Sequence, residues 1–158
     1  MIGYEPLQLA MRQRLEAELP ASLQVISSEF PDSVFLPAPA AYRTTASHEE
    51  AEYPVVFILP GLATPREQTG LWVTTVRELI VVVEHREETE ERLGTALVRY
   101  ERALLGAALG QQAPPPAHGI AWTRPQPGPV VELAGPPALW QSWMQLTFEL
   151  TVYEEDRR

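Results

Sequence analysis

The sequence predicts an α+β domain with a mainly antiparallel sheet and two helices packed on one face. Two stretches repeat apolar residues with the helical period of about 3.6, and the last long stretch alternates apolar and polar residues like a strand. The predicted elements follow the order helix, strands, long strand, helix, strands. Because helices and strands do not alternate regularly, we do not expect a parallel α/β sheet.

The composition bounds the class of protein. With 158 residues, the chain has the size of one domain, and we treat residues 1–158 as a single domain. Cysteine is absent, which excludes disulfides, thiol nucleophiles and thiolate metal sites. All 12 basic residues are Arg and 16 residues are Pro, a bias that suits a thermophilic source and that a GC-rich genome would also produce. The net charge of −9 argues against a surface that binds nucleic acid by neutralising phosphates.

We expect no membrane segment. The longest apolar runs, 55–59 and 79–83, are far shorter than the roughly 20 residues that span a bilayer. Charged residues interrupt the first 19 positions, where a signal peptide would need an apolar core. The sequence therefore predicts a soluble protein made in a cytoplasm.

The first third of the chain predicts one helix and a long loop. Leu7, Met11, Leu15 and Leu19 recur at i+4 spacing, and we expect Pro20 to end this helix. Alternation over 23–27 favours a short strand. Residues 31–52 are proline-rich and polar, which predicts a long loop with at most one short strand, near 34–36.

The middle of the chain predicts the centre of the sheet. Residues 53–59 (YPVVFIL) read as a strand buried on both faces. Residues 61–70 read as a turn-rich connection. Residues 71–85 form the strongest predicted strand, and its first half, 71–77, is amphipathic enough to extend beyond the domain as a hairpin arm.

The rest of the chain predicts the second helix and the closing strand. Apolar residues at helical spacing predict a helix over 87–109, with glutamates in its first turns. Residues 111–137 form a second proline-rich region, with two short strands at 120–123 and 130–133. Residues 140–153 alternate cleanly, so one face of this strand should cover the core and the other should meet water or a partner.

The chemistry-bearing residues form no catalytic pattern. His48, His85 and His118 have no ligand spacing, and the two aspartates, Asp32 and Asp156, lie far apart in the sequence. The glutamates before the second helix read as a solvated helix start, because neighbouring side chains on exposed helical turns fan outward from one another. No serine elbow or phosphate-binding glycine loop is present. We therefore predict no catalytic, metal-binding or cofactor-binding residue and no enzyme activity.

The remaining candidates are contact residues. Trp143 lies on the otherwise polar face of the last strand, which makes it the best single candidate for a contact between subunits. Trp72 and Arg77, from the first half of the long strand, and Tyr153, near the end of the last strand, complete the predicted interface.

The order of these elements resembles a known family. A Leu-rich first helix precedes the Tyr-Pro-Val-Val strand at 53–56 and a long strand that ends in Val81-Val82-Val83. A helix over 87–109 follows directly, and an alternating strand over 146–153 closes the chain. This pattern resembles the tail terminator and tail completion proteins of long-tailed bacteriophages, the neck-region family that includes the lambda tail terminator.

The resemblance implies a structural virion protein. Members of this family form a homohexameric ring that caps the tail tube, stops polymerisation of the tube protein and joins the tail to the head, with DNA passing through the ring. For this chain it implies partners among its own copies, the tail tube protein and a head-completion protein, and it makes Glu84 and Glu149 candidates for an acidic lumen that lets DNA slide. It also implies that residues 61–70 and 71–77 contact the tube or a neighbouring subunit. The alternatives are a head-completion or neck adaptor, another structural assembly protein, or a small enzyme whose carboxylates the sequence does not place.

Overall fold

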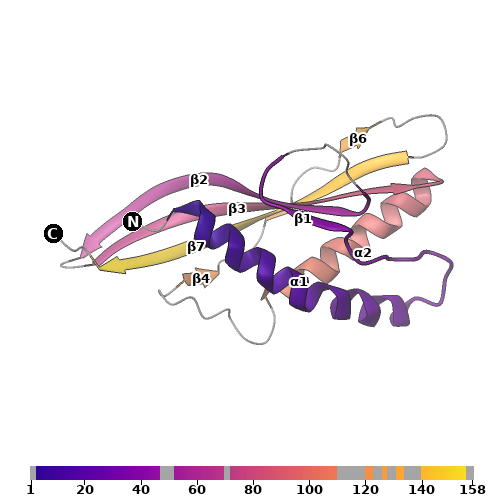
Figure 1. Cartoon of the computed structure of the whole chain (residues 1–158), viewed down its shortest axis with the longest axis horizontal. Helices are drawn as coiled ribbons and strands as arrows, with labels where there is room; N and C mark the ends of the chain where they lie inside the picture. The colour runs from indigo at the N-terminus through magenta and orange to yellow at the C-terminus, as the bar shows by residue number, and fades with distance from the viewer. Residues whose placement is uncertain are drawn as a thin grey trace.

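The computed structural model in Figure 1 confirms the predicted α+β class, with helices packed against a mostly antiparallel mixed sheet. It describes residues 3–46, 52–69, 72–109, 120–122, 126–127, 131–133 and 140–155. The elements are α1 (Tyr4–Glu29), β1 (Ala41–Arg43), β2 (Val55–Thr69), β3 (Trp72–Glu87), α2 (Glu90–Leu109), β4 (Ile120–Trp122), β5 (Gln126–Pro127), β6 (Val131–Leu133) and β7 (Trp140–Glu155).

Three long strands form the body of the sheet. β3 lies in the middle and pairs antiparallel with β2 on one side and with β7 on the other. The short strand β1 extends the sheet in parallel beyond the start of β2. Along the other edge of β7, the short strands β4, β5 and β6 each add an antiparallel pairing. β7 is therefore paired along both of its edges, whereas β1 covers only the beginning of β2.

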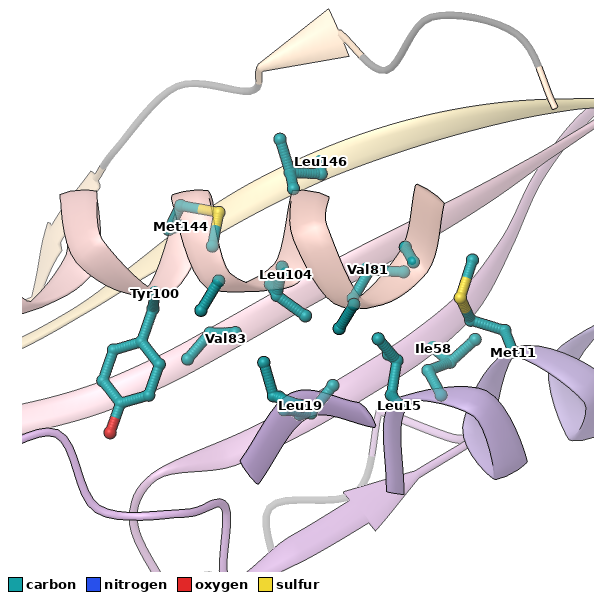
Figure 2. Close-up of a cluster of buried hydrophobic side chains, with 14 of the residues drawn as sticks. Met11, Leu15, Leu19, Ile58, Val81, Val83, Tyr100, Leu104, Met144 and Leu146 are labelled. Carbon is teal, nitrogen blue, oxygen red and sulfur yellow. The ribbon is translucent and has the colours of Figure 1, made fainter. Parts of the chain in front are cut away.

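Both helices cover the same face of this sheet, and the core lies between the two layers (Figure 2). α1 buries one side along its length, including Met11, Leu15 and Leu19, and α2 buries Tyr100 and Leu104. Each such side chain contributes about 1.5–3 kcal/mol on burial. The strand residues that complete the core alternate in sequence: Val56, Ile58, Leu79, Val81, Val83, Met144, Leu146, Phe148 and Leu150.

The first helix is longer than predicted. It continues through Pro20 to Glu29, so the expectation of a helix end at Pro20 and of a strand at 23–27 was wrong. Leu23 and Ile26 prolong the buried side of the helix and pack into the core. Burial of two large side chains offsets the cost of about 3 kcal/mol that a proline inside a helix carries. The helix ends where Phe30 adopts an extended conformation before Pro31.

The first proline-rich region is held against α2. Its strand is β1, at 41–43, and not at 34–36 as expected. The Asp32 carboxylate accepts hydrogen bonds from both terminal nitrogens of Arg99, and the Tyr100 hydroxyl donates to the Pro37 carbonyl over 2.6 Å. The predicted long loop is therefore an ordered strap over residues 30–40. The remainder of the loop, 47–51, lies outside the described residues.

The predicted connection over 61–70 is instead a continuation of β2, with the pairing register shifted between Pro60 and Ala63 and again between Pro65 and Gln68. Together with β3 and β7, this part of β2 runs past the first turn of α1, as Figure 1 shows at the left. We call this three-stranded extension the arm, defined as residues 63–69, 72–76 and 151–155. The sequence prediction of a hairpin arm is confirmed, and β7 supplies its third strand.

The later helix and strands are of the predicted type, but some begin or end at other residues than predicted. α2 begins at Glu90, three residues later than expected, because Thr89 caps it by accepting a hydrogen bond from the Arg92 backbone N–H. The predicted short strands at 120–123 and 130–133 correspond to β4 and β6. The rest of 111–137, apart from β5, lies outside the described residues. In β7 the even positions from 142 to 150 are buried and the odd positions are half-buried, as the alternation predicted.

Candidate interaction surface

The face of the sheet opposite the helices carries the most distinctive surface in the described part of the chain. Alternation places Phe57 and Leu59 of β2, Val82 of β3, and Trp143 and Gln145 of β7 on this face. A groove of about 220 Å³ opens among these side chains, and its remaining lining comes from Ala46 and Glu84. An apolar groove on an otherwise polar sheet face is a feature of protein contact sites.

Trp143 is half-buried and forms one wall of this groove. Its cross-strand neighbour is Glu84 of β3. Trp143 was the leading sequence candidate for a subunit contact, and its position in the groove leaves its indole partly accessible. A half-exposed tryptophan in an apolar depression is the type of residue that dominates binding energy at protein interfaces. Its role in a contact stays a prediction.

One end of the groove adjoins a polar cluster of four side chains. They come from the residues just before β2 (Tyr53), from β3 (Glu84 and Arg86) and from β7 (Gln141). The Gln141 amide nitrogen donates to Glu84 over 2.9 Å and to the Tyr53 hydroxyl over 3.2 Å. The Arg86 guanidinium donates to Gln141 over 2.9 Å and lies 4.0 Å from the centre of the Tyr53 ring. These contacts fix the side chains around the groove before any partner binds.

This cluster encloses Glu84, one of the two lumen candidates. Its side chain is only 3% exposed and accepts a hydrogen bond from Gln141. Glu149 lies on the same face, is half-exposed and stands directly across from Glu78 of β3, so two carboxylates face this surface. Glu149 is therefore the more accessible of the two candidates, and the lumen role of both residues stays a prediction.

The other predicted contact residues lie on or beside the arm. Trp72 pairs with Glu155, and Tyr153 pairs with Thr74, so the backbone of both residues belongs to the arm. Their side chains lie outside what the structure describes. Arg77, at the base of the arm, faces the helix layer and is only 7% exposed, with its guanidinium 5.1 Å from the centre of the Tyr4 ring. Arg77 is therefore a buried residue, and its role in a contact stays a prediction.

His85 is a buried polar residue whose burial the sequence analysis did not predict. His85 is 5% exposed, and its Nε2 lies 3.2 Å from a Glu87 carboxylate oxygen. Its ring meets the Tyr100 ring edge to face, with 5.4 Å between centroids. Burial lowers the pKa of His85, and the nearby Glu87 partly opposes this shift. The signal was present in the sequence, because His85 continues the odd-numbered buried positions 79, 81 and 83.

The described residues contain no group of three or more His, Asp or Glu side chains that could hold a metal ion. Within the same part of the chain, no helix is long and apolar enough to cross a membrane. A scan of protein-family models finds no match to the chain, and a search of curated proteins finds none either.

Proposed function

We propose that this chain is a structural subunit of a bacteriophage tail, which assembles with copies of itself into a ring in the role of a tail terminator. The observation that carries the proposal is the apolar groove beside Trp143, on a sheet face that the helices leave open. Self-assembly would cover this groove. The resemblance in element order is the reason for proposing a phage tail rather than another assembly.

The arm supports the same proposal. It projects beyond the helices on three paired strands, and a paired extension of this kind has the shape to reach a neighbouring subunit or the tube (Figure 1). The outer edge of β2 is unsuited to pairing with another strand, because Pro60 and Pro65 lack N–H donors and two register shifts interrupt it. Contacts of the arm would therefore form through its faces.

The first experiment is native mass spectrometry of the purified chain across a concentration series. We expect a discrete species near six times the 17.7 kDa chain mass. A monomer at every concentration, or an open-ended series of sizes, would refute a closed ring. The virion location is tested by labelling the chain in intact particles and imaging the label at the junction of head and tail.

A second experiment separates a terminator from a neck adaptor. Purified tail tube protein is allowed to polymerise with and without the chain. A terminator shortens the tubes in proportion to its concentration and binds their ends, whereas a head-completion adaptor leaves tube length unchanged. If the ring forms, replacement of Glu149 by Arg tests the lumen, since a basic wall should slow the passage of DNA.

A further inference from the structure

Arg77 is a buried cation without a counter-charge in the described part of the chain. Its side chain is 7% exposed, and its Nε atom is enclosed with no hydrogen-bond acceptor. The ion pairs seen among the described residues involve Arg12, Arg92, Arg99, Arg102 and His85. The contact that holds Arg77 is the ring of Tyr4, at the first residue of α1.

Tyr4 and Glu78 lie beside Arg77, and neither forms an ion pair with it. Burial raises the pKa of Tyr4, although the Arg77 charge opposes the shift, so the phenol is neutral at pH 7. The Glu78 carboxylate accepts a hydrogen bond from the Leu62 N–H over 3.2 Å, and Glu78 belongs to the opposite face of the sheet. Leu150, directly across from Arg77 on β7, is apolar.

The neighbouring end of α1 adds to the positive potential. Gly3 at the helix N-cap makes no side-chain hydrogen bond to the first turn, so backbone N–H groups there keep their positive character. Glu5, the acidic residue of that turn, is exposed. An enclosed arginine next to a helix N-terminus is an arrangement that an anion stabilises, because a guanidinium stays protonated and buried charges are otherwise paired.

We infer that the Arg77 guanidinium binds a carboxylate side chain of a neighbouring subunit when the chain assembles. The inference deepens the proposed function and rests on it. A planar guanidinium matches a carboxylate with two parallel hydrogen bonds, and 21 acidic residues make carboxylates abundant on every copy. A positive point at the base of the arm complements the otherwise acidic surface of a subunit with a net charge of −9.

The test compares assembly with subunit stability in three variants. Arg77→Met keeps the volume and removes the charge, Arg77→Lys keeps the charge and removes the planar fork, and Arg12→Met removes an exposed cation of α1 as the control for net charge. We expect Arg77→Met to weaken assembly at least tenfold while the subunit melts no lower than wild type. Arg77→Lys should weaken assembly less, and Arg12→Met should leave it unchanged.

The outcomes separate this inference from the proposed function. If wild type forms rings and both Arg77 variants do so with equal affinity, the carboxylate contact is refuted and the ring stands. An Arg77→Met variant that loses stability and assembly together, with wild-type assembly in Arg77→Lys, assigns Arg77 to the fold and also refutes the contact. If wild type stays monomeric, ring and contact both fail.

Discussion

Gly61 joins the arm to the body of the molecule. Its carbonyl accepts a hydrogen bond from the Tyr4 hydroxyl over 2.9 Å. A methyl group at this position would lie 2.7 Å from the Glu78 Cβ and 3.2 Å from the Glu78 backbone oxygen. Because Glu78 belongs to the central strand, neither atom can retreat without a shift of the sheet.

We therefore expect Gly61→Ala to destabilise the subunit by about 1–3 kcal/mol, the usual cost of forced overpacking, seen as a lower urea midpoint. Gly94→Ala is the matched control. Nothing lies within 4 Å of a Cβ at Gly94, on the exposed side of α2, so the same substitution should stabilise by about 0.5–1 kcal/mol. Equal effects at the two glycines would show that the close approach at Glu78 is not a constraint.

His85 predicts how stability depends on pH. Burial lowers its pKa below the ordinary value of a histidine, about 6.5, so below about pH 6.5 the unfolded chain binds a proton that the folded chain resists. The stabilisation is present above pH 6.5 and is lost as the pH falls toward the lower folded pKa. Urea unfolding between pH 8 and 5 should show a steeper loss for wild type than for His85→Gln. Parallel curves would exclude His85 as the cause.

Single residues differ in how far the sequence predicts them. The face occupied by Trp143 follows from alternation along one strand, and the same rule would have placed His85 in the core. The contact between Arg77 and Tyr4 joins residues far apart in the sequence, so no local pattern contains it. The enclosure of Glu84 was not predicted either, because its partner, Gln141, comes from another strand.

At the scale of elements, Pro20 tests whether core burial outweighs the cost of a proline inside α1. A proline inside a helix removes one backbone hydrogen bond and clashes with the preceding turn, at a cost of about 3 kcal/mol. Pro20→Ala should therefore stabilise the subunit by about 1–3 kcal/mol, measured as a higher urea midpoint. Pro6→Ala, in the first turn of the same helix, should have little effect, because the first-turn N–H groups have no partner within the helix. A larger gain at Pro6 would contradict this account.

The elements that the sequence predicted well are those with a long, uniform period. β7 and the second helix needed only their own patterns, and the capping by Thr89 moved the helix start by three residues. The strap over 30–40 was predicted as a loop because its order comes from Arg99 and Tyr100 on α2. The strap has several prolines and one buried leucine, so its apolar residues show neither the helical nor the strand period.

At the scale of the whole molecule, two layers of structure leave one sheet face without a covering helix layer. The helices bury one face of the sheet, and the groove beside Trp143 lies on the other. A subunit with a net charge of −9 repels its copies, so apolar contacts must outweigh that repulsion for a ring to form. Higher salt screens the repulsion and should favour assembly through the groove.

Trp143 is the residue on which such assembly depends most. We expect Trp143→Ala to weaken assembly at least tenfold, since an interface tryptophan in a pocket typically contributes about 2 kcal/mol or more. Trp140→Ala is the control, because Trp140, the first residue of the same strand, is 43% exposed and does not line the groove. Sedimentation velocity measures both, and melting temperature verifies that each subunit stays folded. If Trp140→Ala weakens assembly and Trp143→Ala does not, copies meet at the start of β7 and the groove is not the contact.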